Sequence, residues 1–285
     1  MAVYTDLGTE RLANLIAAYD VGDLVSAKGI AEGVSNSNWL IETSGRDGSP
    51  GSQSARFILT MYERRIETAD LPFFLDLLDH LSAADCPVPR TIHDCEGASF
   101  RTVDGKAVAL IEFLPGVSPT APTAAQARAV GVALARMHGA AQDFPGSRTN
   151  DLGPGENAAT LEACGGDALA GIDPNLPAVL ERARTITEEW PSDLPRSIIH
   201  SDLFPDNVLM LGDRVSGLID FYFACEDQMA YDLAVTHAAW CFSKDGSRFD
   251  PALGRALVSG YESVRPLEPH ERDALLLLAE GACLR

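Results

Sequence analysis

The separation of strand-like from helical segments is the feature that most constrains the fold of this 285-residue chain. Strand patterns crowd the first 113 residues, whereas helical patterns dominate from about Thr123 onward. Runs of strands followed by runs of helices are typical of α+β proteins. We therefore predict an α+β fold with two lobes, an N-terminal antiparallel sheet lobe (1–113) and a larger, mainly helical C-terminal lobe (114–285).

The sequence also predicts individual elements. Apolar residues at helical spacing indicate a helix in 9–20, and two strand-like pieces around a Gly/Ser/Asn-rich turn indicate a hairpin in 24–43. A segment of turn composition, 45–54, should be a surface excursion that leads into a strand at 56–63. The further predicted elements are a helix that starts at Leu71, two strands of which the second is 107–113, helices in 123–141 and 175–190, and strands at 197–200, 208–211 and 215–220.

The composition restricts the classes of function. Apolar residues make up 46% and charged residues 22%, which are ordinary values, but the net charge is −19. Such acidity argues against nucleic-acid binding, which needs Lys and Arg to neutralise phosphates. No apolar run approaches the roughly 20 residues that span a bilayer, and the N-terminus lacks a signal-peptide pattern. Six cysteines without CxxC spacing indicate reduced thiols, so we expect a cytoplasmic protein without a membrane partner.

The densest group of hydrogen-bonding and metal-ligating residues lies in the segment SIIHSDLFPDN. His200, Asp202 and Asn207 form the pattern H-x-D-x-x-x-x-N directly after an apolar, strand-like run. Asp220 follows Asp202 by eighteen residues and ends a second strand-like run. Two interpretations compete: a hairpin whose Asp and Asn residues stabilise its turns, or a catalytic loop.

The chemistry of phosphoryl transfer favours the catalytic loop. This reaction requires the protein mainly to position groups and to neutralise charge. One carboxylate must accept the proton of the attacking hydroxyl, while hard oxygen ligands hold Mg²⁺ on the phosphates. A loop with Asp and Asn beside a strand end with a second Asp supplies this set of groups.

The same residues resemble those of a known group of proteins. HSDLFPDN together with LIDF resembles the signature of the aminoglycoside phosphotransferase and choline kinase superfamily, relatives of protein kinases. AVYTDLGTERL, KGIAEGVSNSNWLIET and GLIDFYFAC extend the resemblance to the bacterial homoserine kinases of that superfamily. It implies a protein-kinase-like two-lobed fold and ATP-dependent phosphorylation of L-homoserine to O-phospho-L-homoserine in threonine biosynthesis. Such kinases usually carry a further C-terminal helical segment, so we expect this chain to be shorter than they are.

The resemblance implies a role for each residue of the motif. Asp202 would be the catalytic base for the substrate hydroxyl. Asn207 and Asp220 would be the Mg²⁺ ligands, and His200 would brace the loop.

The resemblance also implies an ATP site in the first lobe. Gly33, Ser35 and Asn36 would lie in the loop over the ATP phosphates, although this segment alone is typical of a plain hairpin turn. The backbone of Glu112 to Leu114 would bind adenine, where the sequence alone indicates only a break after a strand.

One position departs from the superfamily pattern. The lysine that members often carry on the third strand is replaced by Thr60. The helix expected to provide its glutamate partner, 71–82, contains Asp76 and Asp79 but no Glu. The phosphate charge could instead be met by a nearby basic residue, for which the candidates are Arg64, Arg65 and Lys28.

Spacing does not fix the residues that bind the acceptor. Asp206 and Tyr222 are candidates because they flank the expected catalytic and metal-binding aspartates, and 147–153 and Trp240 are further candidates. His138 should be a buried histidine that supports the catalytic loop. Asp232 should be a helix N-cap or a brace for that loop.

Two alternatives to a homoserine kinase stay open from the sequence. The first is a kinase of the same fold for choline, ethanolamine or an aminoglycoside. The second is a nucleotide-binding regulator without catalysis, which the departure at Thr60 leaves open. The oligomeric state is not indicated by any pattern.

Overall fold

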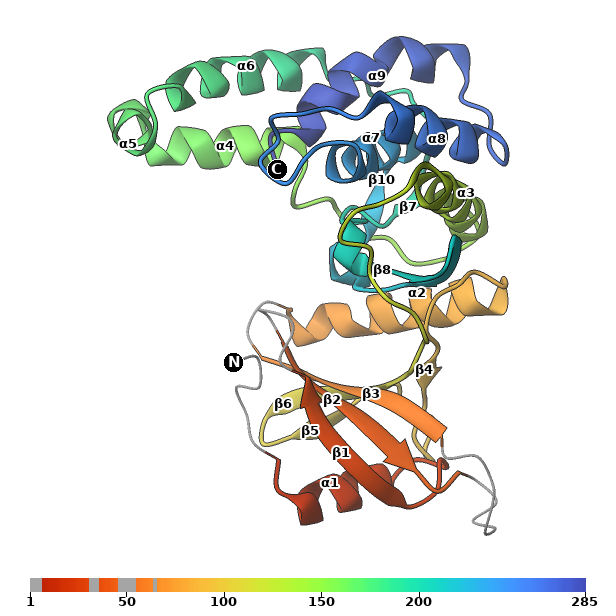
Figure 1. The fold of residues 1–285 in the computed structure, drawn as a ribbon. Coiled ribbons are helices and arrows are strands. Elements are labelled where there is room, and N and C mark those ends of the chain that lie inside the picture. Colours follow the sequence, from red (N-terminus) through yellow and green to blue (C-terminus); the bar gives the residue numbers. More distant parts are fainter. Residues whose placement is uncertain (1–6, 31–35, 46–54, 64–65) are drawn as a thin grey trace. The chain divides into compact units, whose positions relative to one another are not determined.

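The computed structural model describes residues 7–30, 36–45, 55–63 and 66–285. The chain divides into two compact units, a first unit of Met1–Pro115 and a second unit of Gly116–Arg285. The described strands of the first unit form an antiparallel sheet with the order β1-β2-β3-β6-β4, and β5 pairs with β6 (Figure 1). The strands are β1 Leu24–Ile30, β2 Asn36–Thr43, β3 Ala55–Tyr62, β4 Thr91–Ile92, β5 Arg101–Val103 and β6 Lys106–Glu112, and the helices of this unit are α1 Thr9–Ile16, the short η1 Thr68–Asp70 and α2 Leu71–Ala83.

The predicted hairpin, third strand and first two helices are confirmed in the first unit. From Leu71 to the end of β6 the structure has three strands, β4, β5 and β6, where the sequence predicts two. The additional short strand, β5, pairs with β6 through a turn at Asp104 and Gly105, whose φ angles are 51° and 78°. Two consecutive residues with positive φ suit the right-handed twist of a tight hairpin, and Asp-Gly is a favoured pair for it. Most of the predicted excursion 45–54 lies outside the described residues.

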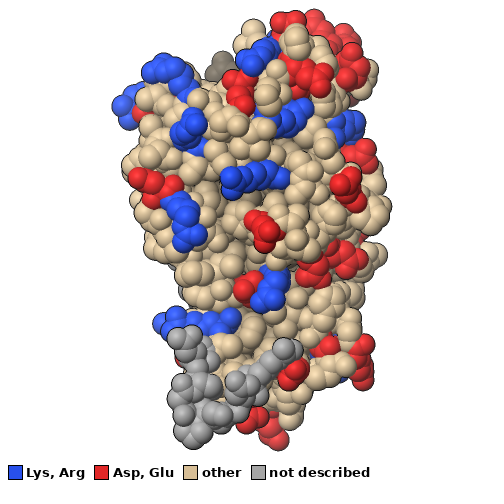
Figure 2. Space-filling model, turned by 90° about the vertical axis from the view of Figure 1, so that its right-hand side faces the viewer, with Lys and Arg blue, Asp and Glu red and all other residues tan. Residues whose placement is uncertain are grey.

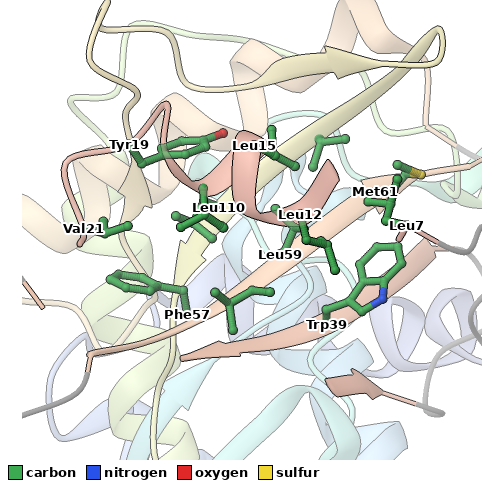
Figure 3. Close-up of a cluster of buried hydrophobic side chains, with 13 residues drawn as sticks. Leu7, Leu12, Leu15, Tyr19, Val21, Trp39, Phe57, Leu59, Met61 and Leu110 are labelled. Atoms are coloured by element: carbon green, nitrogen blue, oxygen red, sulfur yellow. The ribbon is translucent and has the colours of Figure 1, made fainter. Parts of the chain in front are cut away.

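A cluster of buried apolar side chains joins α1 to one face of the sheet (Figure 3). Leu12 and Leu15 of α1 lie beside Leu59 of β3, and Trp39 contributes from β2. Burying a large apolar side chain contributes roughly 1.5–3 kcal/mol to the stability of the folded state. This cluster therefore stabilises the packing of α1 on the sheet.

The second unit is mainly helical, as predicted. Its helices are α3 Ala124–Ala141, α4 Pro154–Cys164, α5 Gly166–Ile172, α6 Leu176–Glu189, α7 Met229–Trp240, α8 Pro251–Glu262 and α9 Pro269–Ala282, with the short η2 Pro205–Asn207 and η3 Phe221–Phe223. Gly131 of α3 and Gly260 of α8 allow these two helices to approach closely. A Cβ atom at Gly131 would lie 2.0 Å from the carbonyl oxygen of Leu257, and one at Gly260 would lie 2.1 Å from that of Arg128.

Two small antiparallel pairs of strands complete the second unit, β7 with β10 and β8 with β9. Their bounds are β7 Arg196–Ile199, β8 Val208–Leu211, β9 Arg214–Leu218 and β10 Cys225–Gln228. The prediction of only three strands in this half was wrong, because the structure has a fourth, β10. Its sequence, CEDQ, carries no strand pattern. Acidic and amide residues are depleted in strands, so β10 is recognisable only through its pairing with β7.

Charged side chains are interspersed on the surface. On the face shown in Figure 2, basic residues stand apart from one another among acidic and uncharged ones. Within the described part of the chain, no helix combines the length and the apolar character needed to cross a membrane. All six cysteines are described, and each is a free thiol.

Candidate active site

The predicted catalytic loop follows β7 and leads through η2 into β8. Asp202 and Asn207 face each other across this loop. The side-chain amide of Asn207 donates to the backbone oxygen of Asp202 at 2.8 Å and to its carboxylate Oδ2 at 3.1 Å. These bonds fix one carboxylate oxygen of Asp202, while 23% of the Asp202 side chain remains exposed.

His200 is a buried residue that braces the loop. Its Nε2–H donates to the carbonyl oxygen of Ile219 at 3.0 Å, and its Nδ1 accepts from the N–H of Asp202 at 3.3 Å. Burial lowers the pKa of His200 to about 4, so the imidazole is neutral near pH 7, as this pair of bonds requires. His200 therefore ties the loop to the end of β9 and has no free nitrogen for proton transfer.

Asp232, in the first turn of α7, holds the backbone of the loop. One carboxylate oxygen accepts the N–H of His200 at 2.8 Å, and the other accepts the N–H of Ser201 at 2.9 Å. Ser201 has a φ angle of 64°, a conformation that costs roughly 1–2 kcal/mol for a residue other than glycine. Asp232 is therefore the brace that we expected as one alternative, and the other alternative, a helix N-cap, was wrong because the N-cap position of α7 is Gln228.

His138 of α3 completes this buried network, as predicted. Its Nε2 lies 3.0 Å from Asp232 Oδ2, and its Nδ1 lies 2.8 Å from the hydroxyl of Tyr261 on α8. Burial alone would raise the pKa of Asp232, but the hydrogen bonds and charge of its surroundings, with His138 first, lower it overall. The close packing of α3 on α8 thus positions the groups that hold the catalytic loop.

We expect Asp232→Ala to lower the free energy of unfolding by about 3–5 kcal/mol, because two buried N–H groups and His138 would lose their acceptor. Urea denaturation measures this effect. Asp167→Ala, on the exposed surface of α5, is the control and should change stability by less than about 0.5 kcal/mol. A loss below about 1 kcal/mol in Asp232→Ala would contradict the role of this network.

Asp220 lies beside the catalytic loop because β9 pairs with β8. Val208 is opposite Leu218 in the register, and the N–H of Ile219 donates to the backbone oxygen of Asn207 at 3.0 Å. Asp220 itself adopts a left-handed conformation with φ 66° and ψ 58°, where the chain leaves β9 and enters η3. Asp220 therefore directly follows the residue whose backbone contacts Asn207.

The carboxylates of the site interact electrostatically. The pKa of Asp202 is raised to about 6: burial raises it most, the charges of Asp220 and Asp206 also raise it, and the charge of Arg285 lowers it. Burial and the charge of Asp206 also raise the pKa of Asp220 to about 6.

These groups fit a hard divalent cation. Asn207 and Asp220 offer an amide and a carboxylate oxygen, and the negative charge of Asp206 lies nearby. Among the residues that the structure describes, no three His, Cys, Asp or Glu side chains cluster as a metal site. A set of one amide and one carboxylate suits Mg²⁺, which is usually held by one or two carboxylates together with phosphates and water.

The acceptor candidates have different surroundings. Asp206 is exposed, and its backbone oxygen accepts a hydrogen bond from Ser118 at 3.0 Å. Tyr222 lies half-buried in η3, directly after Phe221. Trp240 is buried, and its Nε1–H donates to the backbone oxygen of Leu203 at 2.8 Å. It therefore supports the catalytic loop and is not available to an acceptor.

The loop 147–153, the other acceptor candidate, lines a cavity of about 390 Å³ together with Trp190 and Arg196. Two of its polar side chains are hydrogen-bonded to β10. Asn150 donates to Asp227 at 2.7 Å, and Ser147 donates to Glu226 at 2.7 Å.

One further residue contacts the catalytic loop and was missed by the sequence analysis. Arg285, three residues after the end of α9, lies beside Ser201 and Asp202. A single arginine 83 residues away in the sequence gives no local pattern that would place it there.

Thr60 occupies the position at which related kinases often carry a phosphate-binding lysine, and its side chain is hydrogen-bonded within the sheet. Thr60 is buried in β3, and its hydroxyl donates to Asn38 Oδ1 at 2.9 Å. Among the proposed substitutes, Lys28 is exposed on β1, while Arg64 and Arg65 lie outside the described residues.

A different lysine of the first unit does pair with a glutamate. Lys106, at the start of β6, forms an ion pair with Glu63, which also accepts a hydrogen bond from Ser37 at 2.7 Å. Asp79 of α2 accepts the N–H of Thr91 at 3.1 Å and lies 2.6 Å from His93 Nε2, so it serves the internal structure of this unit.

The predicted nucleotide-binding segments are described in part. Gly33 and Ser35 lie outside the described residues, whereas Asn36 is buried at the start of β2. At the end of β6, the N–H of Glu112 donates to Arg90 at 2.9 Å and that of Phe113 donates to Arg56 at 3.4 Å. These two N–H groups are used by the sheet, which makes Leu114 the candidate donor to adenine.

The comparisons with known proteins decide the family. The model of the phosphotransferase enzyme family matches residues 26–267. The chain belongs to this family. The homoserine kinase of Caulobacter sp. (strain K31) is 47% identical over 287 residues, which cover 100% of this chain and 86% of the relative. The homoserine kinase of Gluconacetobacter diazotrophicus is 48% identical over 288 residues, with the same coverage.

A solved phosphotransferase also shares the fold. An amicoumacin kinase in complex with AMP-PNP and Ca²⁺ superposes with a TM-score of 0.75 at 14% identity, covering 98% of this chain and 84% of that chain. The predicted α+β, protein-kinase-like fold is therefore confirmed. At this identity the likeness concerns the fold alone.

Proposed function

We propose that this chain is an ATP-dependent homoserine kinase, which converts L-homoserine into O-phospho-L-homoserine for threonine biosynthesis. The identity of 47% and 48% to two homoserine kinases over the whole chain carries this proposal. The loop with Asp202, Asn207 and Asp220 supplies groups for the chemistry. A non-catalytic regulator is disfavoured because the chain carries all three residues of the motif.

Asp202 accepts the proton of the acceptor hydroxyl as that oxygen attacks the γ-phosphate. Asn207 holds one oxygen of Asp202, which fixes the orientation of the carboxylate before the substrate binds. The buried network of His200 and Asp232 prevents the loop from moving away from this geometry. The expected catalytic gain is one of positioning, as in other phosphoryl transfers.

Asn207 and Asp220 would hold the metal, for which we propose Mg²⁺. When bound, the ion neutralises phosphate charge and orients the phosphates for in-line transfer. In the first unit, the backbone of Leu114 would bind adenine, and Gly33, Ser35 and Asn36 would belong to the loop over the phosphates. Lys106 is a candidate for the phosphate charge that Thr60 cannot meet, since its ion pair with Glu63 resembles in kind the missing lysine–glutamate pair.

The reaction is proposed to take place in the cytoplasm. The free thiols of all six cysteines support this location, because reducing compartments keep cysteines unpaired.

An acceptor panel tests the proposed function. ADP release is measured with Mg·ATP and, in parallel, L-homoserine, choline, ethanolamine, kanamycin and L-serine. We expect turnover with L-homoserine at least about 100-fold above that with the other alcohols, since a site built for one set of polar groups strongly rejects analogues that lack them. A preference for choline or kanamycin would keep the chemistry and replace the substrate. ATP binding without turnover on any acceptor would favour a regulator.

The raised pKa of Asp202 predicts a pH dependence. Below its pKa of about 6 the carboxyl is protonated and cannot accept the hydroxyl proton, so kcat/KM should fall at least about tenfold per pH unit on the acidic side, and more steeply where Asp220 is protonated as well. A pH profile of kcat/KM for the acceptor from pH 5 to 8 measures this limb. The affinity for ATP, measured at each pH, separates an effect of protonation of the nucleotide from the effect of protonation of Asp202. A flat profile down to pH 5 would contradict a base with this pKa.

A further inference from the structure

Arg285 places a positive charge directly beside the proposed catalytic base. Its Nη1 donates to the hydroxyl of Ser201 at 2.9 Å, and its Nη2 lies 3.5 Å from Asp202 Oδ1. Only 11% of the Arg285 side chain is exposed. All three residues belong to the second unit, so this arrangement is internal to one compact body.

Proton transfer gives no reason for an arginine at this position. A neighbouring positive charge stabilises the ionised form of Asp202 and so makes it a weaker base. The orientation of Asp202 also does not require Arg285, because Asn207 already binds the other carboxylate oxygen at 3.1 Å. The contact of 3.5 Å with Asp202 is longer than a well-formed ionic hydrogen bond. A largely buried guanidinium in this geometry therefore suits an additional anion at the site.

We propose that Arg285 binds the carboxylate of the acceptor and thereby selects an α-amino acid over a simple amino alcohol. This inference rests on the proposed function, since it assigns one recognition element of the same site. The planar guanidinium presents five N–H donors and suits bidentate binding of a carboxylate. Nη1 donates to Ser201 and Nη2 lies against Asp202, so these contacts engage two of the five N–H donors.

The size of L-homoserine agrees with this placement. Its hydroxyl oxygen and its carboxylate are separated by a chain of three carbon atoms, which corresponds to roughly 4–5 Å with ordinary bond lengths. A carboxylate bound to Arg285 therefore leaves the hydroxyl within reach of Asp202, given the 3.5 Å between the guanidinium and Oδ1. Arg285 would act as a substrate-positioning residue that sets which hydroxyl faces the base.

The test compares acceptors with and without the carboxylate. L-Homoserine and 3-amino-1-propanol share the hydroxyl, the ammonium group and the chain length, and they differ only in the carboxylate. In Arg285→Gln we expect kcat/KM for L-homoserine to fall about 100-fold, mainly through KM. The value for 3-amino-1-propanol and the KM for ATP should change by less than about threefold, so the preference for the amino acid collapses.

A binding measurement gives a second readout that does not depend on turnover. L-2-Aminobutyrate carries the carboxylate and ammonium of L-homoserine but no hydroxyl. Calorimetry in the presence of ADP should show its affinity for Arg285→Gln reduced about 100-fold relative to the unchanged protein. Arg285→Lys keeps the charge but not the fork, so it should give an intermediate loss.

Arg182→Gln is the matched control, because it shows whether weaker attachment of α9 alone changes the acceptor preference. Arg182 of α6 also holds this part of the molecule, but its ion pair is with Glu280 of α9 and not with the catalytic loop. We expect this variant to keep the acceptor preference. Thermal unfolding of all variants shows whether Arg285→Gln is folded under the assay conditions.

Three outcomes separate the possibilities. Equal losses for both acceptors and for acceptor-free ATP hydrolysis would assign Arg285 to the transferred phosphoryl group and overturn carboxylate binding. An unchanged preference and an unchanged affinity for L-2-aminobutyrate would also overturn it, while leaving the homoserine kinase in place. Failure of the unchanged protein to use L-homoserine would contradict the proposed function, and the inference on Arg285 would fall with it.

Discussion

Replacing Asp202 by alanine is expected to lower kcat about 10³-fold and to leave the Kd for ATP within about threefold. The reason is that, in the proposed mechanism, Asp202 accepts the hydroxyl proton while other groups bind the nucleotide. Asn207 and Arg285 both contact this carboxylate, so the loop is organised around it. Steady-state rates of ADP formation and nucleotide titration measure the two quantities.

Asp213→Ala is the matched control for this substitution. Asp213 is an exposed aspartate in the turn between β8 and β9, and it should tolerate alanine with little change in rate or stability. Asp202→Asn should behave like Asp202→Ala, because the amide has the same shape but cannot accept the proton. Turnover of Asp202→Asn within about tenfold of the unchanged protein would remove Asp202 from the role of base.

Asp220→Ala should instead act through the metal. We expect the Mg²⁺ concentration for half-maximal rate to rise about 100-fold or more, since even residues that only orient metal ligands change affinity by about 10–100-fold. Titration of the rate with Mg²⁺ at fixed ATP measures this shift. At saturating metal, part of the lost rate should return, because Asn207 and the catalytic loop remain in place.

Asp206→Ala separates a metal ligand from a nearby charge. Asp206 affects Asp220 through its charge, and its side chain is exposed, so its removal should shift the Mg²⁺ requirement by less than about tenfold. An unchanged Mg²⁺ requirement in Asp220→Ala would contradict its assignment as a ligand. A larger effect of Asp206 than of Asp220 would exchange the two roles.

The parts of the fold that the sequence predicts are those fixed by local patterns. The hairpin of β1 and β2, the strands β7, β8 and β9, and the helix α3 all have clear apolar periodicity or turn residues. The catalytic loop was recognisable because His200, Asp202 and Asn207 lie within eight residues of one another. The role of His138 was predictable from its place on the apolar face of α3.

The parts that the sequence does not predict depend on contacts between distant segments. Asp232 lies 32 residues after His200, so its spacing could not distinguish a helix cap from a brace for the loop. Arg285 lies 83 residues after Asp202 and shares no pattern with it. The strand β10 has residues that disfavour strands, and only the pairing of Cys225 with Ile199 and its neighbours stabilises it.

Identification of the reaction product tests most directly whether this chain phosphorylates L-homoserine. Purified protein is incubated with ATP, Mg²⁺ and L-homoserine, and the products are followed by ³¹P NMR and mass spectrometry, with Asp202→Ala as the control. We expect O-phospho-L-homoserine and ADP in equal amounts, and neither product above background with Asp202→Ala. Formation of ADP with free phosphate alone, or phosphorylation of a group other than the homoserine hydroxyl, would contradict it.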